Sequence, residues 1–140
     1  MSLLLKVMAT ALTDDVATVP KMKSATLSDG DAGTTVYVWL GDDLESKSAL
    51  YAVGQLSAFE SLKVPQVRDP SKQKDAYRIV LAGLTTKVFH PLSTDDLGPY
   101  RYVEDADGIE SLGRIHRDRN DKIIRLTGAE ATVLAERFNI

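Results

Sequence analysis

Two stretches near the middle of the chain carry the alternating side-chain pattern of paired β-strands. The first is Thr34–Leu40 and the second is Ser48–Leu56, and the polar loop Gly41–Lys47 separates them. Because residues two apart on a strand share a face, Tyr37 and Trp39 lie on one face of the first strand. The opposite face carries the aliphatic residues Val36, Val38 and Leu40. An aromatic strand face beside a polar loop suits a flat ligand, and it suits an ordinary core equally well.

Apolar runs predict three further strands, at Leu3–Met8, Ala76–Leu84 and Lys122–Leu126. Between them the chain is rich in residues that favour turns. Thr13 is a plausible cap for a brief helical turn, and Lys21–Leu27 fits a turn or a short helix.

The segment Ser61–Asp75 is polar and contains Pro65 and Pro70. This composition predicts an exposed loop between the strand Ser48–Leu56 and the strand Ala76–Leu84.

Two short helices are predicted in the second half of the chain. Pro91–Leu97 has Ser93 as a candidate cap, followed by two aspartates that suit the positive end of a helix. Thr127 and Glu130 have the spacing of a capping box, which opens a helix running to about Phe138. Its buried stripe, at helical spacing, consists of Ala131, Leu134, Ala135 and Phe138.

Several strands with few helices, and no alternation of strand and helix, predict an α+β fold that is mainly β. We expect a curled, mainly antiparallel sheet that forms an open barrel, with short helices and a C-terminal helix. The chain has 140 residues, of which 44% are hydrophobic, and this amount of apolar material suits a single domain spanning residues 1–140.

The composition also bears on the cellular setting. The absence of cysteine excludes disulfides and thiolate chemistry and fits a reducing compartment. No run approaches the roughly 18–20 apolar residues of a membrane span, and the short apolar start lacks the basic region of a secretory signal. A soluble, cytoplasmic protein without a membrane partner is therefore expected.

Charge is unevenly distributed along a chain whose net charge is −3. From Ser28 to Glu45 every charged residue is acidic, whereas bases dominate from Leu112 to Leu126. A second basic stretch contains Lys63, Arg68, Lys72 and Lys74. If these two basic stretches meet in space they form a local anion-binding surface, and otherwise they are a solvated hairpin and a solvated loop.

The residues offer little for catalysis. No phosphate-binding glycine loop is present, and His90 and His116 lack metal-ligand spacing to another histidine. Adjacent acids on a strand point to opposite faces, so the pairs Asp42–Asp43, Asp95–Asp96 and Glu104–Asp105 suit turns and caps better than shared proton transfer. We expect a binding module without an active site, a metal or a cofactor.

The order of these elements resembles that of EVE domains, which belong to the PUA-like superfamily. In that family an aromatic strand ending in a Gly turn precedes a strand of the form apolar, apolar, Gly, x, apolar. Thr35–Gly41 and Ala49–Leu56 match this description. The resemblance continues through the polar loop, the next strand, the Pro-Leu segment, the basic segment and the closing helix, so it covers about residues 34 to 138. The family's first strand usually carries a Trp near its start, and Leu3–Met8 has none.

The resemblance implies a PUA-like fold and a module that reads a modified or unpaired base in DNA or RNA. Some EVE domains belong to modification-dependent restriction systems, where they are attached to nuclease or ATPase modules. Extrusion of a base costs a few kcal/mol, and stacking on an aromatic ring returns about 1–3 kcal/mol. On this interpretation the base pocket consists of Tyr37, Trp39 and Tyr51. The contacts to the nucleic-acid backbone come from Lys72, Lys74, Arg101, Arg114, His116, Arg117, Arg119 and Lys122.

Two alternatives stay open at this point. A structural or assembly protein built on a β-rich barrel, a viral one for example, would bury Trp39 fully, expose apolar patches and form a defined oligomer. A reader would instead leave Trp39 partly exposed in a pocket with the segment from Arg114 to Arg119 at its rim. A small-molecule-binding or hydrolytic enzyme has the least support from the residues. The sequence does not fix the oligomeric state.

Overall fold

The computed structural model describes residues 2–41, 48–97, 99, 112 and 121–140. These residues contain a six-stranded sheet in the order β2-β5-β4-β3-β1-β6. The strands are β1 (Ser2–Val7), β2 (Val16–Pro20), β3 (Thr35–Leu40), β4 (Ala49–Pro65), β5 (Gln73–Thr85) and β6 (Lys122–Leu126). The helices are α1 (Thr94–Leu97) and α3 (Gly128–Glu136), with single 3-10 turns at Ala9–Ala11 and Asp29–Asp31.

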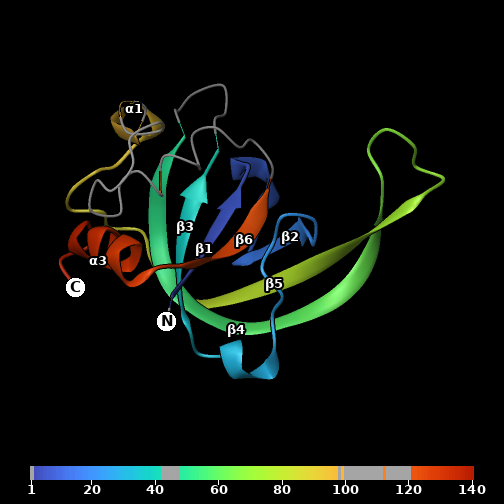
Figure 1. The fold of residues 1–140 in the computed structure, drawn as a ribbon, viewed down its shortest axis with the longest axis horizontal. Coiled ribbons are helices and arrows are strands. Elements are labelled where there is room, and N and C mark those ends of the chain that lie inside the picture. Colours follow the sequence, from blue (N-terminus) through green and yellow to red (C-terminus); the bar gives the residue numbers. More distant parts are fainter. Residues whose placement is uncertain (1, 42–47, 98, 100–111, 113–120) are drawn as a thin grey trace.

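The sheet is mainly antiparallel, as the sequence predicts, and β1 and β3 form its parallel pair. It curls so strongly that β2 and β5 cross over β1, β3 and β6 (Figure 1). Register shifts within β4, between Val53 and Gln55 and between Leu56 and Ala58, accompany this bend. The predicted fold class, a PUA-like open sheet with a C-terminal helix, is confirmed.

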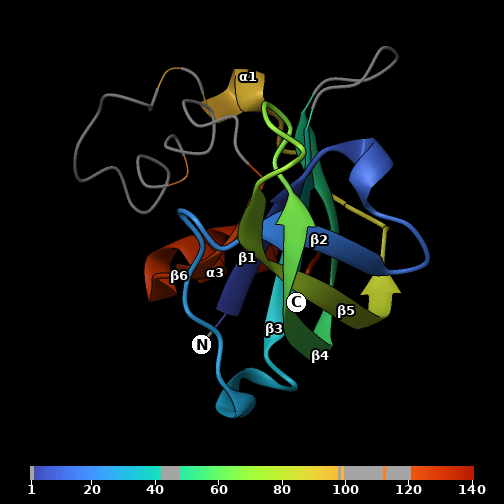
Figure 2. The same cartoon turned by 90° about the vertical axis from the view of Figure 1, so that its right-hand side faces the viewer.

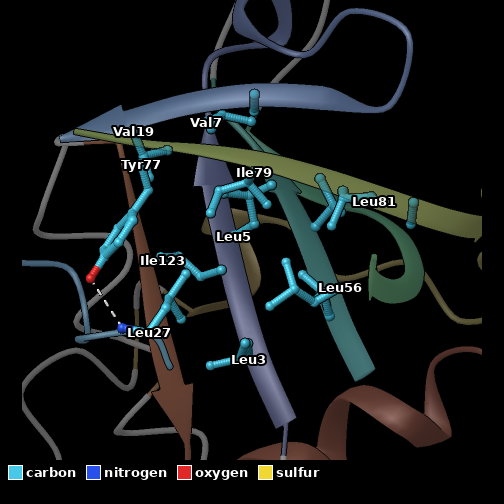
Figure 3. Packing of buried hydrophobic residues seen from close by; sticks show 14 residues of the cluster. Leu3, Leu5, Val7, Val19, Leu27, Leu56, Tyr77, Ile79, Leu81 and Ile123 are labelled. Atoms are coloured by element: carbon cyan, nitrogen blue, oxygen red, sulfur yellow. Dashed lines mark hydrogen bonds between the residues drawn. The ribbon is translucent and has the colours of Figure 1, made fainter. Parts of the chain in front are cut away.

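Both faces of the central strands are buried. Leu3, Leu5 and Val7 of β1 point into the space enclosed by the curled sheet, where they pack against side chains of β2, β5 and β6 (Figure 3). Leu4 points to the opposite face, which α3 and the segment around α1 cover. A strand with both faces buried reads as a continuous apolar run, and this explains the sequence Leu3-Leu-Leu.

The two edges of the curled sheet are joined by residues of the connection between β2 and β3. The hydroxyl of Ser24 donates to the carbonyl of Pro20 at 2.7 Å and accepts from the backbone N–H of Ile123 at 3.1 Å. The N–H of Ala25 donates to the carbonyl of Ile123 at 2.8 Å. These bonds link the end of β2 to β6 across the seam, the gap between the two edges of the open sheet. Of the two alternatives expected for Lys21–Leu27, a turn or a short helix, the structure forms the turn.

The prediction of a helical turn at Thr13 is wrong. Thr13 and Val16 instead exchange two backbone hydrogen bonds of 3.0 Å around Asp14 and Asp15, whose φ angles are +53° and +62°. A two-residue loop with both φ angles positive makes a tight hairpin turn, and aspartate tolerates this conformation better than most residues. The strand that follows, β2, is not evident from the sequence pattern.

The prediction of an exposed loop at Ser61–Asp75 is also wrong for most of that segment. β4 continues to Pro65 and β5 begins at Gln73, so the two strands form a paired arm that extends away from the barrel (Figure 1). In the view of Figure 2 the arm points toward the reader. Only residues 66–72 form its turn, in which Asp69 accepts from the backbone N–H of Ser71 at 3.2 Å.

The predicted terminal helix is confirmed together with its cap. Thr127 accepts from the N–H of Glu130 at 3.2 Å, and the Glu130 carboxylate accepts from the N–H of Thr127 at 3.0 Å. This reciprocal pair satisfies two backbone donors at the start of α3 and sets where the helix begins. Leu134 and Phe138 of the predicted stripe are buried against β3 and β1.

Candidate nucleic-acid interface

Trp39 lies in the core. Its side chain has no exposed surface, and its indole N–H donates to the hydroxyl of Ser48 at 2.7 Å. The expectation of a partly exposed Trp39 in a pocket is therefore wrong. The physical reason is the cover on this face of β3, where Leu92, Leu97 and Leu134 pack in the same cluster. A strand pattern shows which residues share a face, but it does not show what other elements cover that face.

Tyr37 shares this environment. Its side chain is 3% exposed, and its ring centroid lies 6.0 Å from that of Phe138 on the segment after α3. Burial raises the pKa of the Tyr37 hydroxyl. Tyr37 and Trp39 thus belong to the core between the sheet and α3.

Tyr51 does not join them. Val38 pairs with Ala52 and Trp39 pairs with Leu50, so Tyr51 is the extra residue of a β-bulge. The bulge breaks the alternation of β4, and Tyr51 packs against the interior cluster while Leu50 packs with Trp39. The three aromatic residues assigned to one pocket therefore lie on two sides of the sheet.

The predicted phosphate-binding residues fall into three groups. Lys72 is exposed in the turn of the arm, and Lys74 is half-buried near its base. Lys122 is 7% exposed and lies opposite Lys6 in the register of β1 and β6. The remaining five lie outside the described residues: Arg101, Arg114, His116, Arg117 and Arg119.

Arg125, which belongs to the basic stretch of the sequence, is already engaged. Its guanidinium donates to both carboxylate oxygens of Asp31, at 2.7 and 2.9 Å, and to the carbonyl of Thr26 at 2.8 Å. These bonds, together with the N–H of Ser28, lower the pKa of Asp31 to about 2. One acid of the acidic stretch thus neutralises one base of the basic stretch.

A cavity of about 390 Å³ opens at the base of the arm. Its lining comes from the end of β2, the paired strands of the arm and the residue before β6: Thr18, Val19, Pro20, Val64, Pro65, Lys74, Ala76 and Asp121. Lys74 belongs to one of the two basic stretches of the sequence, and Asp121 belongs to the other. The structure therefore brings one residue of each stretch to the same cavity, and the residue from the second stretch is an acid. The anion-binding surface stays a prediction, because Arg114, Arg117 and Arg119 lie outside the described residues.

Asp121 was not singled out from the sequence, where it is one acid among several bases. Its carboxyl is half-buried, and burial raises its pKa. A hydrogen bond from the backbone N–H of Met8 and the positive charges of Lys6 and Lys74 act in the opposite direction. A partly desolvated acid in a cavity is a common property of functional sites. The signal in the sequence was the position of Asp121 within the basic stretch, directly before the strand Lys122–Leu126.

A second cavity, of about 430 Å³, lies at the C-terminal end of α3. His90 and Asn139 line it, and the His90 Nε2 lies 3.1 Å from the Asn139 Oδ1. Within the described ranges, no group of three or more His, Asp or Glu side chains is arranged to hold a metal ion. In the same part of the chain, no helix has the length and apolar character needed to cross a membrane.

The described residues combine a curled, mainly antiparallel sheet with a small mixed-charge cavity at the base of a projecting arm. No family model matches the sequence, and no curated protein matches it significantly. Solved structures do match in fold. A mutant ASCH protein from Zymomonas mobilis aligns with a TM-score of 0.57 and 10% identity, covering 96% of both chains.

Two human structures match along the same length. The DUF55 domain of human thymocyte nuclear protein 1 aligns with a TM-score of 0.54 and 10% identity, covering 98% of both chains. The human THYN1 protein in complex with DNA containing 5-methylcytosine aligns with a TM-score of 0.54 and 10% identity. That alignment covers 97% of this chain and 96% of the human one. These neighbours confirm the EVE and PUA-like resemblance at the level of fold.

Proposed function

We propose that this protein is a binding module for DNA that carries a modified or unpaired base. The observation that carries the proposal is the match in fold, over 97% of the chain, to a human protein solved with DNA containing 5-methylcytosine. The described residues offer a place for such a ligand, because a cavity with a cation and an acid opens at one end of the barrel.

The proposed base site is this cavity, and the aromatic cluster around Trp39 is not part of it. Trp39 has no surface on which a base could stack, since its ring is fully buried. The cavity volume of about 390 Å³ falls near the lower end of the range of about 300–1,000 Å³ typical of small-ligand sites. It suits one extruded base and little more.

The backbone of the DNA would follow the cationic side chains around this cavity. Lys74 lines it and Lys72 is exposed in the turn of the same arm. Arg101, Arg114, His116, Arg117 and Arg119 are proposed to add phosphate contacts on the strength of the sequence. Because the net charge of the chain is −3, such binding depends on local charge, and its affinity should fall as salt rises.

A binding series tests the proposal. Duplexes with one unpaired or 5-methylated base, and plain controls, would be titrated at two salt concentrations. We expect Lys72→Ala with Lys74→Ala to weaken binding to every duplex and to reduce its salt dependence. Lys87→Ala is a matched control, because Lys87 is exposed, lies outside the arm and does not line the cavity. Its Nζ lies 4.9 Å from the centroid of the Phe89 ring. Equal, weak and salt-independent binding of all duplexes by the parent protein would overturn the proposal.

An assembly role is the second candidate, because full burial of Trp39 is what that alternative expects. The large apolar side chains exposed in the described ranges lie on separate segments: Met8, Met22, Val67, Phe89 and Ile140. Light scattering across a concentration series separates the two functions. A defined oligomer that forms without DNA supports assembly, whereas a species whose mass is independent of concentration supports the binding module.

We further propose that the module acts in the cytoplasm within a modification-dependent restriction system, with any catalysis supplied by another module. Phage plating tests this setting. Cells that carry the complete gene should restrict phage with modified DNA more strongly than phage with plain DNA, and equal plating of both would remove the restriction role while leaving DNA binding intact.

A further inference from the structure

The cavity at the base of the arm is lined by apolar residues and by two charged residues. Pro20, Val64 and Pro65 supply rings and aliphatic surface, while Lys74 and Asp121 supply one cation and one acid. A flat heterocycle with polar edges matches such a lining, since its faces pack on apolar groups and its edges need hydrogen-bond partners.

The carboxylate of Asp121 determines which edge of a heterocyclic base can bind in the cavity. An ionised carboxylate accepts hydrogen bonds and donates none, and its two oxygens offer about four acceptor positions. The N–H of Met8 donates to this carboxylate, and Lys6 and Lys74 act on it through their positive charge. Acceptor positions are therefore left for a donor on the ligand. Because the group is half-buried, it lacks part of its hydration and gains more from such a donor.

Bases differ in the donors that they present. Cytosine carries an exocyclic amino group at the position where uracil carries a carbonyl, and 5-methylcytosine and thymine differ in the same way. A carboxylate bonds the amino group and repels the carbonyl. Lys74, a pure donor, suits the ring nitrogen or carbonyl acceptors beside the amino group, or the attached phosphate.

We infer that this cavity takes a base with an exocyclic amino group, and that Asp121 accepts from this amino group and so discriminates against uracil and thymine. The inference rests on the proposed function and adds to it the chemical class of the base. Asp121 is then the specificity-determining residue, and Lys74 contributes affinity to every base.

Matched pairs of duplexes test the inference. The two duplexes of the first pair differ only in one unpaired base, which is cytosine or uracil. Those of the second pair carry 5-methylcytosine or thymine at the same position. We expect the parent protein to prefer the amino-bearing member of each pair by about 5-fold to 100-fold, the range typical of one specific base contact. Asp121→Asn replaces an acceptor-only group by an amide that both donates and accepts. The preference should then fall to within about 2-fold, a range that reflects the loss of that one contact.

Asp75→Asn is the matched control. Asp75 lies beside Lys74 on β5 but does not line the cavity, and its carboxylate pairs with Lys63 at 3.0 Å on the arm. This variant should keep the parent preference. If Asp121→Asn also keeps it while binding persists, the inference is overturned and the proposed function stands.

A second measurement tests the inference when Asp121→Asn does not fold or when no duplex binds. Cytidine and uridine monophosphate would be titrated into the parent protein while the backbone amide resonances of Val64, Lys74 and Ala76 are followed by NMR. Larger shifts with the cytidine nucleotide support the inference even if Asp121→Asn does not fold or no duplex binds. Equal shifts, or none, overturn it. Absence of duplex binding by the parent overturns the proposed function separately.

Discussion

The indole N–H of Trp39 and the hydroxyl of Ser48 form a buried hydrogen bond of 2.7 Å between the end of β3 and the start of β4. Ser48 also accepts, through its carbonyl, from the N–H of Thr94 at 3.0 Å, so the same residue holds the start of α1. The one tryptophan of the chain therefore organises the outer core, where α1, α3 and the sheet meet. Trp39 therefore contributes to core packing, and its removal should lower the free energy of unfolding.

Ser48→Ala should destabilise the protein by about 1–3 kcal/mol, because it leaves the buried indole N–H without this acceptor. Urea unfolding followed by Trp39 fluorescence measures the change. Ser57→Ala is the control, since Ser57 is exposed on β4 and its substitution should shift the free energy of unfolding by less than about 0.5 kcal/mol. Equal unfolding curves for Ser48→Ala and the parent would show that the hydrogen bond contributes nothing.

Trp39→Ala should lower the stability further, by about 3–5 kcal/mol, because it opens a cavity in the outer core. The variant is informative for DNA binding as well. Under conditions where it stays folded, it should keep the base preference of the parent, since the ring has no exposed face. If a folded Trp39→Ala protein kept its affinity but lost the preference, Trp39 would have to take part in base recognition.

Asp31 and Arg125 predict a pH dependence of stability. The pKa of Asp31 is lowered from 3.8 to about 2, mainly by the hydrogen bonds from Arg125. A carboxyl whose folded-state pKa is depressed stabilises the fold above its unfolded value, and this contribution is lost as the pH falls through the interval toward 2. Since Arg125 is about a third exposed and partly screened, we expect about 1–2 kcal/mol.

The comparison of Asp31→Asn with the parent measures this contribution. The difference in the free energy of unfolding should be complete at pH 7 and should shrink as the pH falls from about 4 through 2. Asp29→Asn, an exposed acid of the same turn, serves as the control and should show little difference at either pH. A constant difference between Asp31→Asn and the parent over the whole range would contradict the electrostatic explanation.

Much of the fold follows from local patterns in the sequence. The strand Lys122–Leu126, the face shared by Tyr37 and Trp39, and the capping box of Thr127 and Glu130 were predictable because neighbours in sequence determine them. The β-bulge at Tyr51 was not predictable, because it depends on the pairing of β4 with β3. The strands of the arm were not predictable from the sequence for a similar reason. Each is stabilised by pairing with the other and has no apolar pattern of its own.

The candidate site was predictable only in part. Lys74 was selected from charge alone, and the structure places it at a cavity. Asp121 was missed because its environment comes from β1, β2 and the arm, which lie far from it in the sequence. Long-range contacts of this kind leave no periodic signal along the chain.

Ser24→Ala tests the seam of the barrel. The substitution removes the acceptor of the Ile123 N–H and the donor to the Pro20 carbonyl, so we expect a loss of about 1–2 kcal/mol. Amide hydrogen exchange locates the effect. The Ile123 amide should exchange faster in the variant, while amides of the β4–β5 pair change little. Ser71→Ala, in the exposed turn of the arm, is the control, and similar exchange in both variants would show that Ser24 does not close the seam.

Gly54→Ala tests why the second strand of the central pair contains a glycine. A Cβ at this buried position would lie 2.8 Å from the carbonyl oxygen of Ala82 and 2.7 Å from a methyl of Leu84. The carbonyl belongs to the paired strand β5 and cannot rotate away, so β4 and β5 must separate where the sheet bends. We expect a loss of about 1–3 kcal/mol, measured by urea unfolding. At Gly30 the added methyl would meet only the Ser28 hydroxyl at 4.0 Å, so Gly30→Ala is the matched control. Equal stability of the two variants would mean that the bend of the sheet tolerates a side chain, and the glycine would then have no steric role.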